Sequence, residues 1–460
     1  MARRGVTFVT FGCRVNQVES ASLLRSGRGA GYVQAAPGEA AALVVVNTCA
    51  VTGESERQAR QAIRRAVRAH PGARVVVTGC YAQRDPKALA EIPGVSLVVG
   101  NADKTCLFAI LESATVPPPG GVDARYMSTG AGGCPPMLLD ADAFTLYPTV
   151  ADTPIESPAA DTSGRARAYL QVQNGCDAGC TFCVIPSLRG RGRSTPLERV
   201  LAQAGRLLEQ GFEELVLTGI NLGAYGRDLA EAVTLSDLLE QILALPNLGR
   251  LRLSSIAPQD LDAHFLRHLV EHPRLCPHLH LSVQSGDDLI LKRMHRSCTR
   301  EQVLATIAAV RDRRPGIVLG ADLIVGFPTE SEEAFANTLN LLREGEIALP
   351  HTFRYSDRPG TPAARIPPHL HVPAAVIRDR AERLRRQGEA ILHDLLQRQV
   401  GQEAEVLIEE VAHGLAHGKT GGFLPLTFPT DDATCVGRLT RVRVTGVDAS
   451  GGGLLGELPG

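Results

Sequence analysis

The first 115 residues alternate between short apolar runs and stretches with helical periodicity. Each apolar run is bounded by Gly, Pro or Asn, and the helical stretches, such as 54–69, lie between the runs. Alternation of strands and helices in this form is typical of a doubly wound parallel sheet. The strands are predicted at 6–10, 43–46, 75–78 and 97–99.

The same alternation returns near residue 167 and continues to about residue 355. Six β/α units are too few to close an eight-stranded barrel, so the pattern predicts an open, partial (β/α)6 barrel of the TIM type. Its strands are predicted at 169–173, 214–218, 250–254, 278–282, 316–323 and 351–355, and its helices at 196–210, 235–244, 300–313 and 331–343.

The end of the chain has a different pattern. A long amphipathic helix at 374–399 leads into strand-like segments at 403–409, 437–447 and 454–458. Short strands separated by glycine-rich turns predict a small β-barrel.

One segment breaks the alternation. Residues 115–164 are rich in Pro, Gly, Ala and Asp and show no periodicity, which indicates a partly disordered linker or insertion. The predicted units are therefore 1–114, the linker 115–164, the barrel with its connecting helix at 165–396, and the small β-barrel at 397–460.

Charge and hydropathy limit the possible partners and compartment. A net charge of −1 gives no general argument for nucleic-acid binding, so RNA contacts must come from local patches. No apolar run approaches the roughly 20 residues of a membrane-spanning helix, and no long apolar region follows the two N-terminal arginines as in a secretory signal. We expect a cytoplasmic protein without membrane contact. Thiols stay reduced there, so 11 cysteines favour metal ligation or catalysis over disulfides.

The sharpest motif is a C-x3-C-x2-C loop formed by Cys176, Cys180 and Cys183, just after the predicted strand 169–173. Thiolates this close can hold one [4Fe–4S] cluster and leave its fourth iron without a protein ligand. The amino and carboxylate groups of S-adenosylmethionine (AdoMet) can chelate that iron, and electron transfer then yields a 5′-deoxyadenosyl radical. A structural zinc site is the alternative, but no fourth Cys or His follows within ten residues.

A second set of cysteines, Cys13, Cys49 and Cys80, follows three successive predicted strands. The carboxyl ends of parallel strands meet at the edge where doubly wound sheets bind ligands. Neighbouring strands lie about 5 Å apart, so the three thiols could converge on one inorganic centre. Position alone leaves three buried structural cysteines equally open.

The cysteine loop carries an aromatic residue, Phe182, before its last cysteine, and in this it resembles the radical-AdoMet superfamily. The resemblance extends through LTGINL at 217–222, RLSS at 252–255, SVQSG at 282–286 and GADLIVGFP at 320–328, each at or just past a predicted strand end. It implies that AdoMet is bound by residues on this rim: Phe182, Thr218, Gly219, Ser255, Gln284 and Asp322.

The motifs around the other cysteines are similar to the three cysteine segments of the methylthiotransferase family. These motifs are FGCRVNQ at 11–17, NTCAVT at 47–52 and TGCYAQ at 78–83. That family's N-terminal cluster domain, radical-AdoMet barrel and C-terminal TRAM barrel cover the whole chain. The resemblance implies a second [4Fe–4S] cluster on Cys13, Cys49 and Cys80 that handles sulfur. It also implies two roles for AdoMet, as methyl donor and radical source, with a flavodoxin- or ferredoxin-like electron donor, a sulfur donor and a monomeric enzyme.

Three substrates occur within the family: threonylcarbamoyladenosine (t6A) in tRNA, isopentenyladenosine in tRNA, and an aspartate of a ribosomal protein. The words at 12–17 and 174–176, with IPSLRGRGRS at 185–194, resemble the t6A branch most. The isopentenyl branch more often has Gln-Met-Asn after the first cysteine. A non-catalytic RNA-binding protein with zinc at 176–183 is a hypothesis of a different class. The succession of radical-AdoMet motifs along the predicted barrel argues against it.

Local charge supports RNA as the substrate. Arg57, Arg60 and Arg64 fall on one stripe of the predicted helix after Cys49. A second group, Arg189, Arg191 and Arg193, follows the cysteine loop directly, and we predict that both groups contact phosphates. The C-terminal 60 residues have eight carboxylates against four Lys and Arg, which argues against strong RNA binding by this segment alone.

Overall fold

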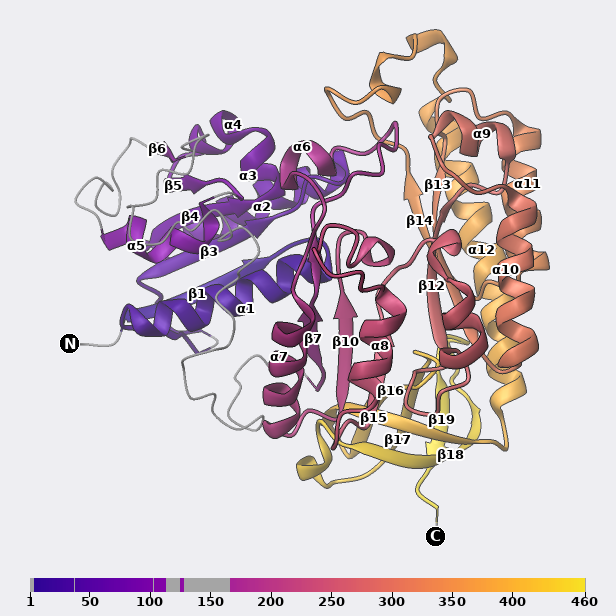
Figure 1. Cartoon of the computed structure of the whole chain (residues 1–460). Coiled ribbons are helices and arrows are strands. Elements are labelled where there is room, and N and C mark those ends of the chain that lie inside the picture. Colours follow the sequence, from indigo (N-terminus) through magenta and orange to yellow (C-terminus); the bar gives the residue numbers. More distant parts are fainter. Residues whose placement is uncertain (1–3, 37, 102, 113–124, 128–165, 460) are drawn as a thin grey trace.

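The computed structural model describes residues 4–36, 38–101, 103–112, 125–127 and 166–459. Three units follow one another along the chain: an N-terminal sheet with helices on both faces, a central set of strands with helices along its outside, and a small barrel at the C-terminus (Figure 1). None of the described helices combines the length and the apolar composition that a membrane span needs.

The N-terminal unit is a six-stranded parallel sheet in the order β2-β1-β3-β4-β5-β6. Successive residues of its central strands face opposite sides, and each side packs on its own helices, as a doubly wound sheet requires. The strands are β1 (Arg4–Thr10), β2 (Tyr32–Gln34), β3 (Leu43–Thr48), β4 (Arg74–Gly79), β5 (Val95–Val99) and β6 (Arg125–Met127). The helices are α1 (Arg14–Gly29), α2 (Gly53–Ala69), α3 (Cys80–Arg84), α4 (Pro86–Ala90) and α5 (Leu107–Glu112).

Two strands of this sheet were not expected from the sequence. Both β2 and β6 contain three residues and lie at the two edges, where one neighbour is enough to hold a strand and no long apolar run is needed. Strand β6 falls inside the segment predicted to be a linker, so that interpretation is wrong for residues 125–127. The rest of the predicted linker, 115–124 and 128–164, lies outside the described residues.

The central unit contains six parallel strands in two groups, ordered β11-β10-β7 and β12-β13-β14. Isolated parallel bridges, Leu251 to Leu275 and Ile256 to Leu281, connect the two groups, so the unit is the expected open, partial barrel. The strands are β7 (Ala168–Gln171), β10 (Glu214–Thr218), β11 (Arg250–Leu253), β12 (His278–Gln284), β13 (Val318–Val325) and β14 (Leu349–Arg354); β8 (Gln173–Asn174) and β9 (Arg193–Ser194) form a small antiparallel pair.

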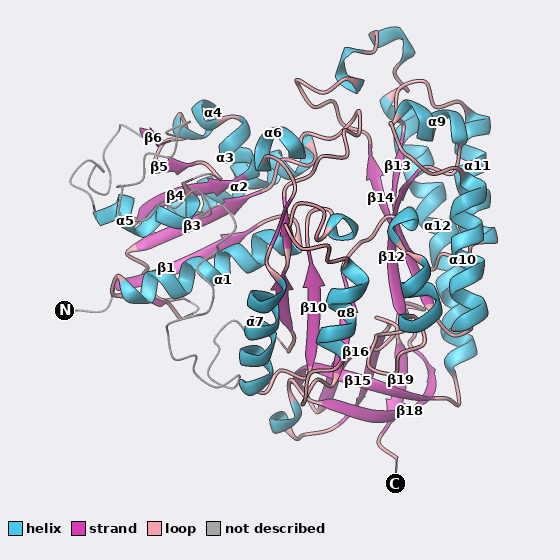
Figure 2. Ribbon diagram, viewed as in Figure 1, coloured by secondary structure: helices cyan, strands magenta, loops and turns pink. Residues whose placement is uncertain are grey.

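Helices line the outer side of the partial barrel and leave its interior to the strand ends and loops (Figure 2). Their apolar faces join the strands in one continuous core, for example through Val200, Leu238, Ile307 and Phe335. The helices are α6 (Ile185–Arg189), α7 (Leu197–Glu209), α8 (Leu235–Leu243), α9 (Asp288–Arg293), α10 (Arg300–Arg313), α11 (Glu332–Glu344) and the long α12 (Ala374–Gln399).

The C-terminal unit is a closed five-stranded barrel in the order β15-β16-β17-β19-β18. Its strands are β15 (Glu403–Ala412), β16 (Leu415–Thr420), β17 (Pro425–Pro429), β18 (Leu439–Val447) and β19 (Leu454–Glu457). Alternate residues of the strands fill its centre, and Leu396 of α12 and Val318 of β13 complete the same core. The barrel therefore packs directly on the central unit.

Buried arginines of the central unit make both junctions between units. Toward the N-terminal sheet, Arg189 donates to Glu19 over 2.7 Å and Arg358 donates to Glu56 over 2.7 Å. Toward the C-terminal barrel, Arg250 and Arg252 donate to backbone carbonyls; these are the oxygens of residues 405, 419, 420 and 421. Both arginines of the second junction keep Glu214 of their own unit as a carboxylate partner.

Candidate active site

The N-terminal cysteines lie together at the carboxyl edge of the first sheet. Cys13 caps the start of α1 after β1, Cys49 follows β3, and Cys80 begins α3 directly after β4. Gly12 makes the approach possible: its φ is +89°, and a Cβ there would lie 2.7 Å from Cβ of Cys49. The expectation from strand order, three thiols at one sheet edge, therefore agrees with the arrangement in the structure.

Electrostatics confirm that these three thiols share one location. Burial, and to a smaller extent the neighbouring Cys80 and Cys13, raise the pKa of Cys49 to about 12. The protein around Cys13 raises its pKa too, although its side chain keeps accessible surface because it faces a cavity. Thiolates that repel one another in this way would be stabilised together by a positively charged metal centre.

The second triad is local to one loop. Gly175 has a φ of +71°, and a Cβ there would lie 1.9 Å from the backbone oxygen of Arg191, so only glycine lets the loop pack on the chain that leaves it. Burial is the main reason why the pKa of Cys183 is raised to about 12, and repulsion from Cys180 and Cys176 contributes to the same rise. The sulfur of Cys176 accepts the backbone N–H of Ala178 over 3.4 Å.

The spacing of both triads fits a cluster better than a single ion. Zinc–sulfur bonds of about 2.3 Å hold tetrahedral sulfurs about 3.8 Å apart. Within the described part of the chain, one group of three metal-binding side chains has all its ligand atoms within 4.8 Å of one another, and it contains no cysteine. A [4Fe–4S] cube separates its ligands more widely, since each thiolate binds a different iron.

Two cavities connect these cysteines to the barrel interior. The larger, about 850 Å³, lies between all three units and is lined by Cys13 and Cys49, by barrel strand ends, and by Lys419 and Phe423 of the C-terminal barrel. The smaller, about 720 Å³, contains Cys176, Cys180 and Cys183. Ser255 lines both, so the two cavities meet at this residue.

The residues predicted to bind AdoMet divide between the two cavities. Phe182 and Gln284 line the smaller cavity with the cysteine loop, and Ser255 lines both. Thr218, Gly219 and Asp322 line the larger cavity instead. Asp322 lies with the N-terminal cysteines and is held by two histidines, and its contact with AdoMet stays a prediction.

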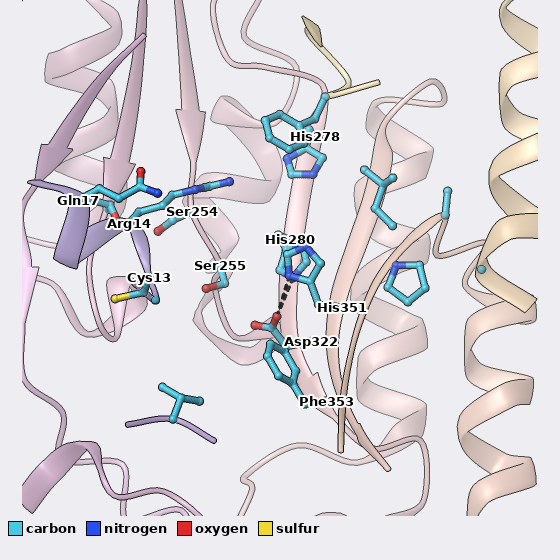
Figure 3. A pocket seen from close by; sticks show the side chains of 18 of the residues that line it. Cys13, Arg14, Gln17, Ser254, Ser255, His278, His280, Asp322, His351 and Phe353 are labelled. Carbon is cyan, nitrogen blue, oxygen red and sulfur yellow. Dashed lines mark hydrogen bonds and ion pairs between the residues drawn. The ribbon is translucent and has the colours of Figure 1, made fainter. Parts of the chain in front are cut away.

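A polar wall of the larger cavity was missed by sequence reasoning. His278 and His280 on β12, Asp322 on β13 and His351 on β14 line it, opposite Cys13 (Figure 3). Asp322 Oδ1 lies 2.9 Å from His280 Nε2 and 3.3 Å from His351 Nδ1. The available signal was the alternation along β12, His-Leu-His-Leu-Ser-Val-Gln, which places polar side chains on one face of a strand inside a barrel.

Arg189 is a correction to the predicted RNA contacts. Its side chain is 2 % exposed, and its guanidinium donates to Glu19 and Asn174 through Nη1 and to Asn16 through Nη2. Asn16 follows Cys13 by three residues and Asn174 precedes Cys176 by two, so one guanidinium ties both cysteine loops together. Burial alone would raise the pKa of Glu19, but Arg189 and Lys104 hold it well below its usual range.

The other predicted RNA-contacting arginines remain at or near the surface. Arg57 is exposed and pairs with Glu54, Arg60 donates to the hydroxyl of Tyr81 over 2.7 Å, and Arg64 is exposed. Arg191 is 93 % exposed, and Arg193 is half-buried and donates to the backbone oxygen of residue 189. Neither arginine group forms one continuous basic stripe, because pairing and burial remove Arg57 and Arg189 from it.

Known proteins similar to this chain show its family. Residues 170–342 match the Radical SAM superfamily, and residues 5–100 match a family described as "Uncharacterized protein family UPF0004". The threonylcarbamoyladenosine tRNA methylthiotransferase MtaB of Rickettsia prowazekii is 37 % identical over 96 % of this chain and 94 % of its own length. The chain belongs to the radical SAM methylthiotransferases. It is therefore an AdoMet-dependent iron–sulfur enzyme.

Other methylthiotransferases show similar coverage. MtaB of Bacillus subtilis is 33 % identical over 95 % of this chain and 93 % of its own length. The tRNA-2-methylthio-N(6)-dimethylallyladenosine synthase of Moorella thermoacetica is 32 % identical over 96 % of each chain. Among solved structures, the radical S-adenosylmethionine methyltransferase TsrM from Kitasatospora setae shares the fold with a TM-score of 0.55 at 16 % identity, covering 90 % of this chain and 81 % of that one.

Proposed function

We propose that this methylthiotransferase adds a 2-methylthio group to threonylcarbamoyladenosine in tRNA. The observation that carries the proposal is the polar wall of the larger cavity, which faces Cys13. An isopentenyl group is a hydrocarbon, and burying it against charged and hydrogen-bonding side chains would leave those side chains without partners. A threonylcarbamoyl group offers N–H, carbonyl, hydroxyl and carboxylate groups that can pair with them.

The names of similar proteins agree with this choice without deciding it alone. The first five relatives carry the MtaB name at 31–37 % identity, and dimethylallyladenosine synthases follow at 32–34 %. Because the two ranges overlap, the cavity chemistry provides the stronger argument for the t6A branch.

Each triad holds one [4Fe–4S] cluster in this proposal. The loop of Cys176, Cys180 and Cys183 opens into the smaller cavity, where Phe182, Gln284 and Ser255 would bind AdoMet. A cluster there supplies electrons for reductive AdoMet cleavage. Cys13, Cys49 and Cys80 would hold the cluster that carries sulfur.

The protein's own contribution is to place the target base between the two sites and to exclude water. Ser255 is small and lines both cavities, so a base in the larger cavity can present one edge to the smaller one. Arg189 fixes the distance between the two cysteine loops through Asn16 and Asn174. Such fixed geometry lowers the entropy cost of bringing the reacting groups together.

The remaining partners follow from this chemistry. The substrate tRNA would contact the exposed Arg64 and Arg191 and the half-buried Arg60 and Arg193, with Arg57 able to exchange Glu54 for a phosphate. A flavodoxin- or ferredoxin-like protein would supply electrons and a separate donor would supply sulfur. We place the enzyme in the cytoplasm as a monomer.

Two experiments test the proposal. Mass spectrometry of tRNA nucleosides from cells that lack and then regain the gene should show loss and return of the 2-methylthio derivative of t6A alone. Loss of the isopentenyl derivative, or unchanged tRNA with an unmodified ribosomal protein, contradicts the proposed substrate. Reconstituted protein should hold about eight irons; a colourless protein with stoichiometric zinc would favour the non-catalytic alternative.

The two triads can be separated with single substitutions. Cys176→Ala should abolish 5′-deoxyadenosine formation, because the loop that binds AdoMet loses its cluster. Cys49→Ala should keep AdoMet cleavage and yield no methylthiolated nucleoside. Paired chromatography of both products, with iron counted, makes the measurement. If Cys49→Ala retains full iron and full product, the N-terminal cysteines are structural.

A further inference from the structure

The His280, Asp322 and His351 group stands apart from both cysteine triads and has unused bonding capacity. Both histidines approach the same oxygen of Asp322, Oδ1. Its other oxygen, Oδ2, has no partner among the described residues and points toward Ser255 in Figure 3. Burial alone would raise the pKa of Asp322, but the two histidines hold it well below its usual range, so the group is a carboxylate at neutral pH.

The ring of His351 is also directed by this contact. Its Nδ1 faces Asp322, which leaves Nε2 on the open side of the ring, and the side chain is 63 % exposed. His280 cannot reach further into the cavity, since its Nδ1 packs against the backbone of Gly320, where a Cβ would lie 2.4 Å away. Asp322 and His351 therefore present the free polar atoms, while His280 holds Asp322 in place.

Buried polar atoms on the same wall lack partners as well. Ser254 and His278 line the larger cavity and are more than nine-tenths buried, and among the described residues Ser254 Oγ and His278 Nδ1 have no hydrogen-bond partner. Buried polar groups are nearly always paired in native structures, so a wall with several free ones indicates a polar ligand. The cavity of about 850 Å³ lies within the range of small-molecule sites.

The charges fit an anionic ligand with N–H groups. The cavity is lined by Arg14, Arg385 and Lys419 against Asp322 and Glu389, a surplus of one cation before any histidine is counted. The same group could hold a metal ion, because one ligand atom of each side chain lies within 4.8 Å of the others, and a bound ion would replace the two contacts to Asp322.

We propose that Asp322 and His351 form the subsite for the N6 substituent of the target adenosine: Asp322 Oδ2 accepts an N–H of the carbamoyl group, and His351, whose Nδ1–H donates to Asp322, accepts the threonyl hydroxyl through Nε2. His280 is a positioning residue for Asp322. This inference rests on the proposed t6A substrate and names the side chains that select it. It also assigns Asp322 to tRNA and not to AdoMet.

The test compares two tRNAs that differ only in the threonylcarbamoyl group, bound to the full-length enzyme with both clusters reconstituted. Wild type should bind the t6A tRNA about tenfold to a hundredfold more tightly than the unmodified tRNA, as charge-assisted hydrogen bonds allow. Asp322→Asn and His351→Phe should each bring that ratio close to one without changing affinity for the unmodified tRNA. His369→Phe, an exposed histidine outside the cavity, is the matched control and should keep the full ratio.

AdoMet and metal measurements on the same proteins exclude other roles. AdoMet cleavage without tRNA should keep its KM in both variants; a raised KM for AdoMet would overturn the assignment. An extra metal ion that wild type binds and His351→Phe loses would overturn it too. If wild type methylthiolates t6A tRNA but the variants keep the wild-type ratio of affinities for the two tRNAs, the proposed subsite is wrong while the proposed function stands. If wild type does not methylthiolate t6A tRNA, the proposed function fails and the subsite with it.

Discussion

The partial barrel holds its two neighbours with the same residue type in opposite ways. At the N-terminal junction, Arg189 and Arg358 enter the neighbouring unit and pair with its carboxylates, Glu19 and Glu56. At the C-terminal junction, Arg250 and Arg252 keep a carboxylate of their own unit, and each donates to two backbone carbonyls of the barrel beyond.

The difference indicates how each junction depends on sequence. A carboxylate partner can be lost by one substitution, whereas a backbone carbonyl is present whatever the side chain. The N-terminal junction is therefore specified by side chains in both units. The C-terminal junction depends on the backbone path at residues 405 and 419–421, and two ion pairs, Arg167 with Glu409 and Arg438 with Glu213, add side-chain contacts to it.

The largest effect is expected from Glu19→Gln. Arg189 and Lys104, each at most 2 % exposed, would lose their carboxylate, and an uncompensated buried charge costs about 3–5 kcal/mol. Because Arg189 holds Asn16 near Cys13, the methylthiolated product should be lost, while AdoMet cleavage, which depends on the loop of Cys176, Cys180 and Cys183, should continue. Anaerobic urea denaturation followed by circular dichroism, with product analysis, makes the measurement. If the first unfolding transition in urea occurs at the same concentration as in wild type, the junction does not need the pairing of Glu19 with Arg189.

A smaller loss is expected from Glu214→Gln at the other junction. Arg250 and Arg252 would lose their carboxylate but keep their carbonyl partners, so we expect destabilisation of about 2–3 kcal/mol. The same denaturation experiment measures it. A loss equal to that of Glu19→Gln would mean that the carbonyl contacts contribute little and that the two junctions do not differ.

The pH dependence of stability sharpens the comparison at Glu214. Burial alone would raise its pKa, but Arg252, Arg250 and Arg167 lower it to about 2. A lowered pKa contributes stability that is complete above the unfolded value of about 4.3 and is lost as pH falls toward the folded value. Wild type should therefore lose about 1–3 kcal/mol more than Glu214→Gln between about pH 4.5 and pH 2. Parallel stability curves for the two proteins would contradict this.

The smallest effect is expected from Glu405→Ala. Its backbone oxygen accepts from Arg250, while its half-exposed carboxylate lies 3.6 Å from that arginine. The substitution keeps the oxygen and removes only a surface ion pair, so the free energy of unfolding should change by less than about 1 kcal/mol. A loss of several kcal/mol would show that side chains specify this junction as well.

Much of the fold could be predicted from the sequence because its signals are local. Strand β10 and helices α10 and α12 begin and end where hydrophobic periodicity predicts. The short edge strand β2 and the hairpin strands β16 and β17 were missed, since three to six residues in polar surroundings carry little periodicity.

The candidate site also contains residues that the sequence could predict and residues that it could not. The cysteine loops could be found because their spacing and strand positions lie within the sequence itself. Arg189 could not be assigned, because the run Arg-Gly-Arg-Gly-Arg has the pattern of a surface basic patch, and the carboxylate that buries its first arginine lies 170 residues earlier. Asp322 was linked to AdoMet by its place in a strand-end motif, whereas its histidines come from two other strands.

The order of synthesis gives the Glu19 pairing a consequence for how the enzyme is made. Glu19 meets Lys104 within the first sheet, but its second cation, Arg189, leaves the ribosome 170 residues after Glu19 itself. Until the segment that follows the cysteine loop of the barrel has been translated, the carboxylate has only one of its two cationic partners, and Asn16 lacks the guanidinium that holds it near Cys13. The loop of Cys13 therefore reaches its final geometry only after the second cysteine loop has been synthesised.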